Sequence, residues 1–293
     1  MTAIETPVLT KAPLTKARRS ALTPRPKWWL YIVLTLGGIA MIFPFIWMIL
    51  GSFKTTAEIR SNPLGFLPEN ATLDNYTQLF GRLDFTTFFM NSAIVALFVT
   101  LGNIVFSSMV GYALAKLEFR GKKLLFVLVL GTLMVPGVVT FVPLFVLTSN
   151  LGLVNSYPGL ILPFLITPLG VFLMRQFISS LPDDILEAAR IDGASEGLIL
   201  RKIVLPTLKP VLITLALFIF LGSWNDFMWP LIVLADQNLY TLPVALAALS
   251  REHVQDNELM MAGSVITVLP VLVLFLALQR HYLSGLMAGS VKG

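Results

Sequence analysis

Six long stretches of the chain are almost entirely apolar, and shorter segments rich in charged or turn-forming residues separate them. A helix needs about 20 mostly apolar residues to cross the roughly 30 Å hydrocarbon core of a bilayer. We therefore predict an all-α integral membrane protein with six transmembrane helices, over residues 28–50, 88–114, 124–147, 157–177, 211–234 and 259–282. Prolines inside several of these segments predict kinks, because neighbouring helices can satisfy the backbone carbonyls that a proline leaves free.

The composition agrees with this pattern and excludes several classes of protein. Of the 293 residues, 56% are hydrophobic and 13% are charged, and the mean hydropathy is +0.82. Soluble domains carry about 25% charged residues, so a soluble enzyme or a nucleic-acid binder is excluded despite the net charge of +5. The chain has no cysteine, which excludes disulfides and thiolate metal sites. His253 and His281 are its only histidines, so no multi-histidine metal centre is expected.

The distribution of basic residues predicts the orientation in the membrane. Seventeen Lys or Arg residues lie before the first span, between spans two and three, over 175–210, and from Arg280 onward. The alternate links 51–86, 149–156 and 235–258 hold four. Cytoplasmic segments carry an excess of Lys and Arg, so both termini are predicted to be cytoplasmic. We expect residues 1–27 to be a flexible basic tail and residues 28–293 to form one transmembrane domain, because the first apolar run is longer than a signal-peptide core.

The link 181–206 between spans four and five does not have the composition of a simple loop. Pro182 suits a first helical turn, and the acids Asp183 and Asp184 complement the positive end of a helix dipole. Gly193 provides a left-handed stop, and Ser195 suits the start of a second helix. We therefore predict a helix–turn–helix. The small-sided face of its first helix, which we expect to fit a groove of another protein, consists of Ile185, Ala188, Ala189 and Asp192.

An alternative is an amphipathic linker that lies on the membrane surface. Residues 175–210 hold five acids as well as five bases, whereas a lipid-binding face is mainly basic. The small alanines also offer little apolar area for insertion into lipid. Both features favour contact with a protein.

The spacing in this link resembles a known family. Glu187-Ala188-Ala189, three residues, Gly193, nine residues and then 203–206 (Ile-Val-Leu-Pro) match the EAA motif of membrane subunits of binding-protein-dependent ABC importers. The resemblance covers roughly 28–293. Within the family, the sequence resembles the carbohydrate-importer branch and is similar to the six-span permeases of maltose and glycerol-phosphate systems. Supporting segments are 43–45 (Phe-Pro-Phe), 52–54 (Ser-Phe-Lys), 224–227 (Trp-Asn-Asp-Phe), 230–231 (Pro-Leu), 279–286 and 289–293.

The resemblance implies a type I ABC importer permease fold with a cytoplasmic coupling helix that a separate ATPase subunit holds. The chain has no P-loop, because Gly121-Lys122-Lys123 lacks the upstream glycine and the hydroxyl residue of that motif. Glu187 is expected to be a polar anchor to a basic residue of the ATPase; a solvated surface acid is the alternative. The residues expected to couple to the ATPase are Glu187, Ala188, Ala189, Asp192, Gly193, Leu205 and Pro206.

The same resemblance implies the assembly and the cell membrane in which it works. The expected partners are a second permease subunit, two ATPase subunits and an extracytoplasmic substrate-binding protein. No cofactor is expected in this chain, since the ATPase would bind ATP and Mg²⁺. The location would be the plasma membrane of a prokaryote.

Polar residues within the fifth span are candidates for contact with the solute. Asn225 and Asp226 lie roughly 4 to 6 Å past the middle of the span. An acid at that depth usually faces a cavity or a partner. Together with Trp224 or Trp229, these residues could contact the hydroxyls and the apolar face of a sugar. The alternatives are that Asp226 braces helices or that the span ends early.

The link 235–258 is predicted to face outward, where the resemblance implies contact with the binding protein. Arg251, Glu252 and His253 are the candidates, and we expect the link 51–86 to contribute to the same surface. A plain solvated loop is equally consistent with the composition of 235–258.

These observations favour an importer permease that moves a sugar or sugar-like solute by alternating access. One alternative is an ion-coupled secondary transporter that acts without an ATPase. It would need several charged groups in the membrane, whereas Asp226 is the one clearly available. An intramembrane enzyme would need a catalytic set that the spans do not contain. The sequence does not identify the solute.

Overall fold

The computed structural model describes residues 28–82, 84–252 and 257–288, and every regular element in these ranges is helical. The predicted tail 1–27 lies outside the described residues. The chain divides into two compact units, one ending at Phe45 and the other beginning at Ile46. Helix α1 (Trp28–Gly51) begins in the first unit, and all other helices belong to the second unit, which holds both candidate sites.

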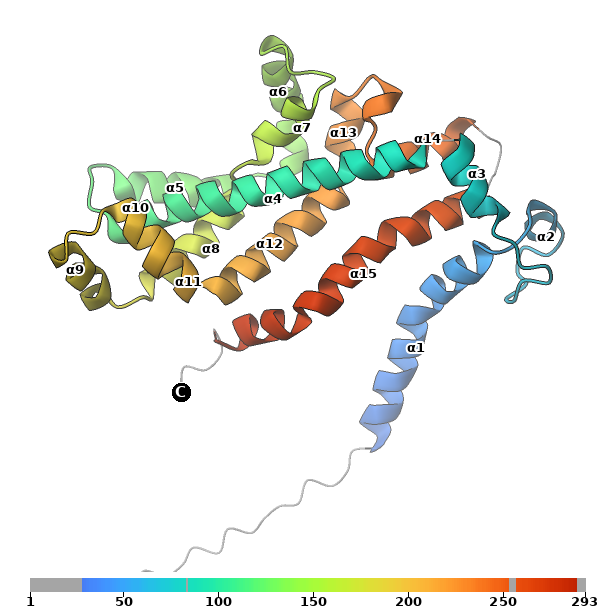
Figure 1. The fold of residues 1–293 in the computed structure, drawn as a ribbon, viewed down its shortest axis with the longest axis horizontal. Coiled ribbons are helices and arrows are strands. Elements are labelled where there is room, and N and C mark those ends of the chain that lie inside the picture. Colours follow the sequence, from blue (N-terminus) through green and yellow to red (C-terminus); the bar gives the residue numbers. More distant parts are fainter. Residues whose placement is uncertain (1–27, 83, 253–256, 289–293) are drawn as a thin grey trace, which may run out of the picture. The chain divides into compact units, whose positions relative to one another are not determined.

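Figure 1 shows the order of the helices. Beyond α1, they are α2 (Thr56–Ser61), α3 (Asp74–Arg82), α4 (Phe85–Lys116), α5 (Lys122–Leu133), α6 (Gly137–Asn150), α7 (Tyr157–Ile161), η1 (Leu162–Phe164), α8 (Pro168–Ser179), α9 (Asp183–Ile191), α10 (Glu196–Ile199), the π-helical η2 (Leu200–Val204), α11 (Leu205–Thr207), α12 (Lys209–Trp224), α13 (Met228–Val233), η3 (Gln237–Leu239), α14 (Leu242–Glu252) and α15 (Asn257–Ala288).

Four helical segments of the described chain are long and apolar enough to cross a membrane: Trp28–Gly51, Phe85–Lys116, Tyr157–Ser179 and Asn257–Gln279. Two bent pairs raise the number to six if each pair is one span. Five of these regions coincide with predicted spans. The sixth, 196–207 together with α12, takes in part of the predicted link 181–206 and only the first part of the predicted span 211–234. The predicted all-helical membrane fold is confirmed.

Two of the predicted spans are broken rather than continuous. The segment 124–147 is divided into α5 and α6, which meet at 108°. Pro136, which was expected to cause a kink, lies at this break and has no N–H with which to continue the helix. The segment 211–234 is divided at 225–227, where α12 ends and α13 has not yet begun. A second bend, of 85°, separates 196–207 from α12.

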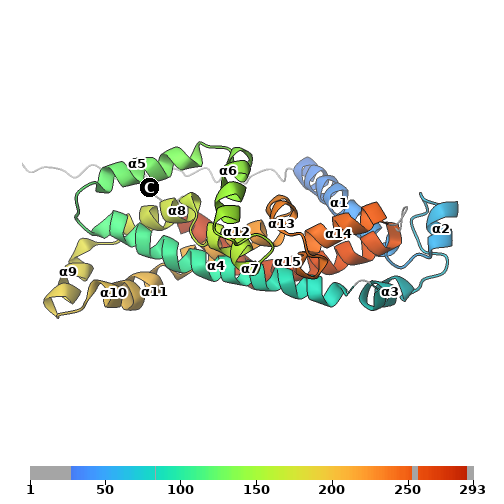
Figure 2. The same ribbon diagram turned by 90° about the horizontal axis from the view of Figure 1, so that it is seen from above.

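Helix α4 is central to the second unit, because it packs against both α8 and α12. In Figures 1 and 2, α9, α10 and α11 lie near the C-terminal end of α4, and α3 lies near its N-terminal end. Small residues of α4, Ser107 and Gly111, are buried where this helix contacts α8. A Cβ added at Gly111 would lie 2.7 Å from the Cβ of Met174, so only glycine permits this close approach.

Candidate functional site

The link between α8 and α12 folds into a helical hairpin, residues 183–207, as the sequence predicts. Helix α9 ends with N–H groups of Asp192 and Ala194 donating to the carbonyls of Ala188 and Ala189, at 3.0 and 2.9 Å. Gly193 has φ +82°, a left-handed conformation that glycine adopts without a Cβ clash. The backbone of Ser195 is extended, and α10 begins directly after it. The predicted turn is therefore confirmed.

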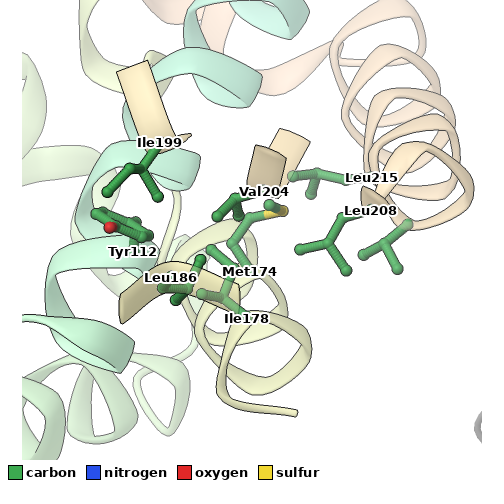
Figure 3. Packing of buried hydrophobic residues seen from close by; sticks show 9 residues of the cluster. Tyr112, Met174, Ile178, Leu186, Ile199, Val204, Leu208 and Leu215 are labelled. Carbon is green, nitrogen blue, oxygen red and sulfur yellow. The ribbon is translucent and has the colours of Figure 1, made fainter. Parts of the chain in front are cut away.

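One face of the hairpin is buried against the transmembrane helices. Leu186 of α9, Ile199 of α10 and Val204 of η2 are each at most 1% exposed. Figure 3 shows these side chains with their neighbours in one cluster, which contains Tyr112 of α4, Met174 and Ile178 of α8, and Leu208, Val211 and Leu215 at the hairpin's exit. Burying an aliphatic side chain of this size contributes roughly 1.5 to 3 kcal/mol. The hairpin is therefore a fixed part of the bundle.

Polar contacts join the hairpin to the last turns of α4. The Tyr112 hydroxyl donates to Glu196 Oε2, and Arg190 Nε donates to Glu196 Oε1 at 2.8 Å. Lys116 Nζ donates to Asp183 Oδ1 and to the Leu181 carbonyl, both at 2.6 Å. The hydrogen bond from the Lys116 ammonium holds the pKa of Asp183 below its usual value.

The opposite face of α9 is exposed. Ile185 is 54% exposed and Ile191 is 85% exposed, although both are large apolar residues. Five of the predicted coupling residues, Glu187, Ala188, Asp192, Gly193 and Pro206, are also exposed. The other two, Ala189 and Leu205, are half-buried and pack against the cluster beneath the hairpin.

The second candidate site is the break between α12 and α13. The N–H and the side-chain amide of Asn225 both donate to the Leu221 carbonyl, at 3.1 and 2.8 Å. Asp226 Oδ1 accepts from the N–H of Trp229 at 3.3 Å and so caps the first turn of α13. Asn225 is exposed and Asp226 is half-buried.

The two tryptophans predicted to line a solute pathway are fully buried. Trp224 is 2% exposed, stacks on Phe220, and donates from Nε1 to the Thr267 carbonyl at 3.1 Å. Trp229 is 1% exposed and donates from Nε1 to the Gly159 carbonyl at 3.1 Å. In this conformation both indoles join helices, and that of Trp229 also borders a cavity. Their contact with a solute stays a prediction.

A cavity of about 210 Å³ lies beside the break. Asp226 is the one charged residue that lines it, and the hydroxyl side chains of Thr167 and Ser223 contribute its other polar groups. The remaining lining is Val95, Val99, Leu160, Phe164, Phe218, Ile219, Gly222, Trp229 and Pro230. The structure thus places Asp226, but not Asn225 or Trp224, on this cavity.

The candidates for binding-protein contact are only partly described. Arg251 and Glu252 end α14, but their side chains lie outside the described residues, as does all of His253. The link 51–86 is well organised by polar contacts. Lys54 and Glu58 are 4% and 7% exposed, and Lys54 Nζ lies 3.6 Å from Glu58 Oε1. The Glu69 N–H donates to the same oxygen at 2.9 Å.

Sequence reasoning missed the residues that attach the hairpin to α4. Tyr112, Lys116, Arg190 and Glu196 belong to no recognised motif, and Tyr112 and Glu196 are 84 positions apart. The spacing of Tyr112 and Lys116 places them one helical turn apart, which is the only local signal that they act on the same neighbour.

Comparison with known proteins shows which family these features accompany. The family described as "Binding-protein-dependent transport system inner membrane component" matches residues 103–286. The arabinooligosaccharides transport system permease protein AraQ of Halalkalibacterium halodurans is 40% identical over 92% of this chain and 98% of its own length. The trehalose/maltose transport system permease protein MalG of Thermococcus litoralis is 36% identical over 89% of this chain and 97% of its own length.

A solved structure supports the fold independently. It belongs to a bacterial ABC transporter involved in the import of the acidic polysaccharide alginate, and it matches 87% of this chain and 95% of its own with a TM-score of 0.80. At 22% sequence identity, this match shows the fold alone.

Proposed function

Because this chain belongs to the family of binding-protein-dependent transport system inner membrane components, we propose that its hairpin 183–207 is the element that a separate ATPase subunit binds. The chain is a permease of a binding-protein-dependent ABC importer for oligosaccharides or sugars. Permeases of this family carry no cofactor and are not catalytic, because a partner ATPase hydrolyses ATP. This family excludes the alternative of an ion-coupled transporter that works alone.

The two-faced character of the hairpin carries this proposal. Its inner face is fixed to the bundle by Leu186, Ile199 and Val204, whereas its outer face leaves Ile185 and Ile191 exposed. Exposed apolar side chains beside small residues are typical of surfaces that bind another protein. Glu187 lies on the exposed part of α9 and takes part in none of the ion pairs found among the described residues, so its carboxylate is available to a partner.

The complete importer in this proposal contains a second permease, two ATPase subunits that bind ATP and Mg²⁺, and an extracytoplasmic binding protein. The hairpin and both termini face the cytoplasm of a prokaryotic cell, in agreement with the positions of the basic residues. Closure of the ATPases moves the hairpins as rigid bodies, and the bundle alternates between inward-open and outward-open states. Arg251, Glu252 and His253 would contact the binding protein.

The proposed solute is a sugar or an oligosaccharide, in keeping with the substrates that the names of these relatives give. Its pathway in this chain would pass the break between α12 and α13. Asp226 is the best-placed group, since its carboxylate lines the cavity beside the break. Asn225 is exposed at the same break. Trp229 also lines this cavity, whereas Trp224 would contribute its ring after a rearrangement of its buried packing.

The test is the variant Glu187→Lys in the full complex, co-expressed with its partner subunits. We expect less ATPase to co-purify with the permeases, or ATP hydrolysis to continue without uptake, because a lysine repels a basic residue on the ATPase. Asp74→Lys is the matched control for co-purification of the ATPase, since Asp74 is an exposed acid on α3, away from the hairpin. Normal co-purification together with normal coupled uptake in Glu187→Lys would refute the role of Glu187.

A further inference from the structure

We infer that Tyr112, Lys116 and Glu196 are positioning residues that lock the hairpin to α4, so that motion of the hairpin is delivered to α4. This inference rests on the proposed function, because it assumes that an ATPase moves the hairpin. It concerns a different question, namely which transmembrane helix receives that motion and through which side chains.

Glu196 joins three helices through one carboxylate. Its Oε2 accepts the hydroxyl of Tyr112 from α4, and its Oε1 accepts Arg190 Nε from α9 at 2.8 Å. Arg190 Nη2 also donates to Oε2, at 3.3 Å, so two hydrogen bonds join the guanidinium to the carboxylate. Bidentate, charge-assisted pairs of this kind fix orientation as well as distance. Glu196 itself belongs to α10, so the contact closes the two hairpin helices on each other and on α4.

A second attachment lies one turn further along α4. Lys116 is four residues after Tyr112, and residues at this spacing share one face of a helix. Its side chain is 6% exposed, and its ammonium reaches both Asp183, at the start of α9, and the Leu181 carbonyl before it. The two attachments therefore hold the beginning of α9 and the beginning of α10.

The apolar cluster beneath the hairpin cannot supply this constraint alone. Burial of Leu186 and Ile199 favours contact between the hairpin and the bundle, but the hydrophobic effect is not directional. Two polar attachments, one turn apart on α4 and at the beginnings of α9 and α10, prevent the hairpin from sliding or rotating on that contact. The hairpin and the end of α4 then move as one body.

The covalent exit from the hairpin to α12 is less rigid than this attachment. The chain passes through the π-helical residues 200–204 and Pro206, and it bends by 85° before α12. A π-helical segment and a proline both interrupt the regular hydrogen bonding of an α-helix. The bend can change while α4 follows the hairpin, which makes α4 the direct receiver of motion and α12 the indirect one.

The experiment uses the complete importer in lipid vesicles with its binding protein, and measures solute taken up per ATP hydrolysed. Tyr112→Phe removes one hydroxyl and keeps the buried ring, and Glu196→Ala removes the shared carboxylate. We expect uptake per ATP to fall by about fivefold or more, the lower end of typical coupling between sites, while the ATPase stays bound. Tyr31→Phe is the matched control, because it removes a tyrosine hydroxyl from an exposed side chain of α1, outside the hairpin and outside the links expected to contact the binding protein.

Two results would overturn the inference. Uptake per ATP equal to that of the wild type in Tyr112→Phe and Glu196→Ala would show that α4 needs no such attachment. Loss of the ATPase from these variants would show that the residues hold the ATPase instead. Failure of the proposed function gives a different result from failure of this inference. The Glu187→Lys complex would then assemble and take up solute like the wild type, whatever the Tyr112 variant does.

A charge exchange keeps the test decisive if a single variant folds poorly. Lys116→Asp and Asp183→Lys each place two like charges together and should lower uptake per ATP. The double variant restores an opposite pair at the same place, so the ratio should recover. A double variant as uncoupled as the singles would contradict the role of this pair.

Discussion

Replacing Gly111 by alanine should separate two of the central helices. Gly111 lies at a close contact between α4 and α8. A Cβ at this position would lie 2.7 Å from Met174 Cβ and 2.9 Å from the backbone nitrogen of Arg175. Carbon atoms in favourable contact are about 3.5 to 4.0 Å apart, so α8 would have to move away by roughly 1 Å. The obstacle includes backbone, which a change of rotamer cannot relieve.

The expected loss of stability follows from two opposing effects. Overpacking of a well-packed contact costs about 1 to 3 kcal/mol. Alanine also favours a helix over glycine by up to about 1 kcal/mol, which offsets part of that cost. Because the obstacle includes backbone, the overpacking cost should be near its upper end, and the net destabilisation should be about 2 kcal/mol. A loss of 1 kcal/mol lowers the midpoint of thermal unfolding by about 2 to 4 °C in chains of 150 to 250 residues.

The assay is thermal unfolding of the purified complex in detergent, with Gly131→Ala as the control. Gly131 lies within α5, and a Cβ there would meet nothing within 4 Å, so alanine should leave the midpoint unchanged or raise it. Gly111→Ala should unfold several degrees below both the wild type and this control. If the two alanine variants unfold at the same temperature, the α4–α8 contact is not as tight as the structure indicates.

Three further predictions test the hairpin and the break. Gly193→Ala forces alanine into a left-handed conformation, which costs about 1 to 2 kcal/mol. It should therefore lower the unfolding midpoint more than Gly197→Ala, since Gly197 does not have a left-handed backbone; equal midpoints would contradict this. Asp226→Ala should change uptake while the complex still assembles, whereas loss of assembly in a pull-down would favour a bracing role. Because Lys116 lowers the pKa of Asp183, their pairing stabilises the fold above the ordinary aspartate pKa of about 3.9 and is lost as the pH falls through the lowered pKa. The unfolding midpoints of the wild type and Asp183→Asn should therefore converge below about pH 4, and a constant difference would contradict this.

The spans and the hairpin turn were predictable because local sequence determines them. Six apolar runs of about 20 residues specify membrane helices whatever their neighbours are. Gly193 was predictable because a helix that ends in a left-handed residue usually ends at glycine, and its φ of +82° agrees. Pro136 indicated a kink, but the angle of 108° depends on contacts of α5 and α6 that no local pattern encodes.

The surroundings of Trp224 and Trp229 could not be predicted from the sequence. A continuous helix would place both residues in the same part of a single span, so the sequence suggested one group with Asn225 and Asp226. The helix instead ends at Trp224 and resumes at Met228. The two indoles therefore enter different buried clusters, one with Phe85 and one with Leu160.

Polar residues in the spans have a structural task that must be separated from transport. Each break in a membrane helix leaves backbone groups that cannot reach water, and leaving them unsatisfied costs several kcal/mol. Asn103 of α4 donates to the Phe164 carbonyl at the break before α8, at 3.2 Å.

Asp226 performs this task as well, since Oδ1 accepts the N–H of Trp229. It differs from Asn103 because its carboxylate is ionisable and also lines the cavity beside the break. A capping role requires one acceptor oxygen, which asparagine also supplies, whereas a charged contact with a solute requires the carboxylate itself. Asp226→Asn therefore distinguishes the two roles more sharply than alanine does: assembly preserved with altered uptake indicates the pathway, and wild-type uptake indicates a cap alone.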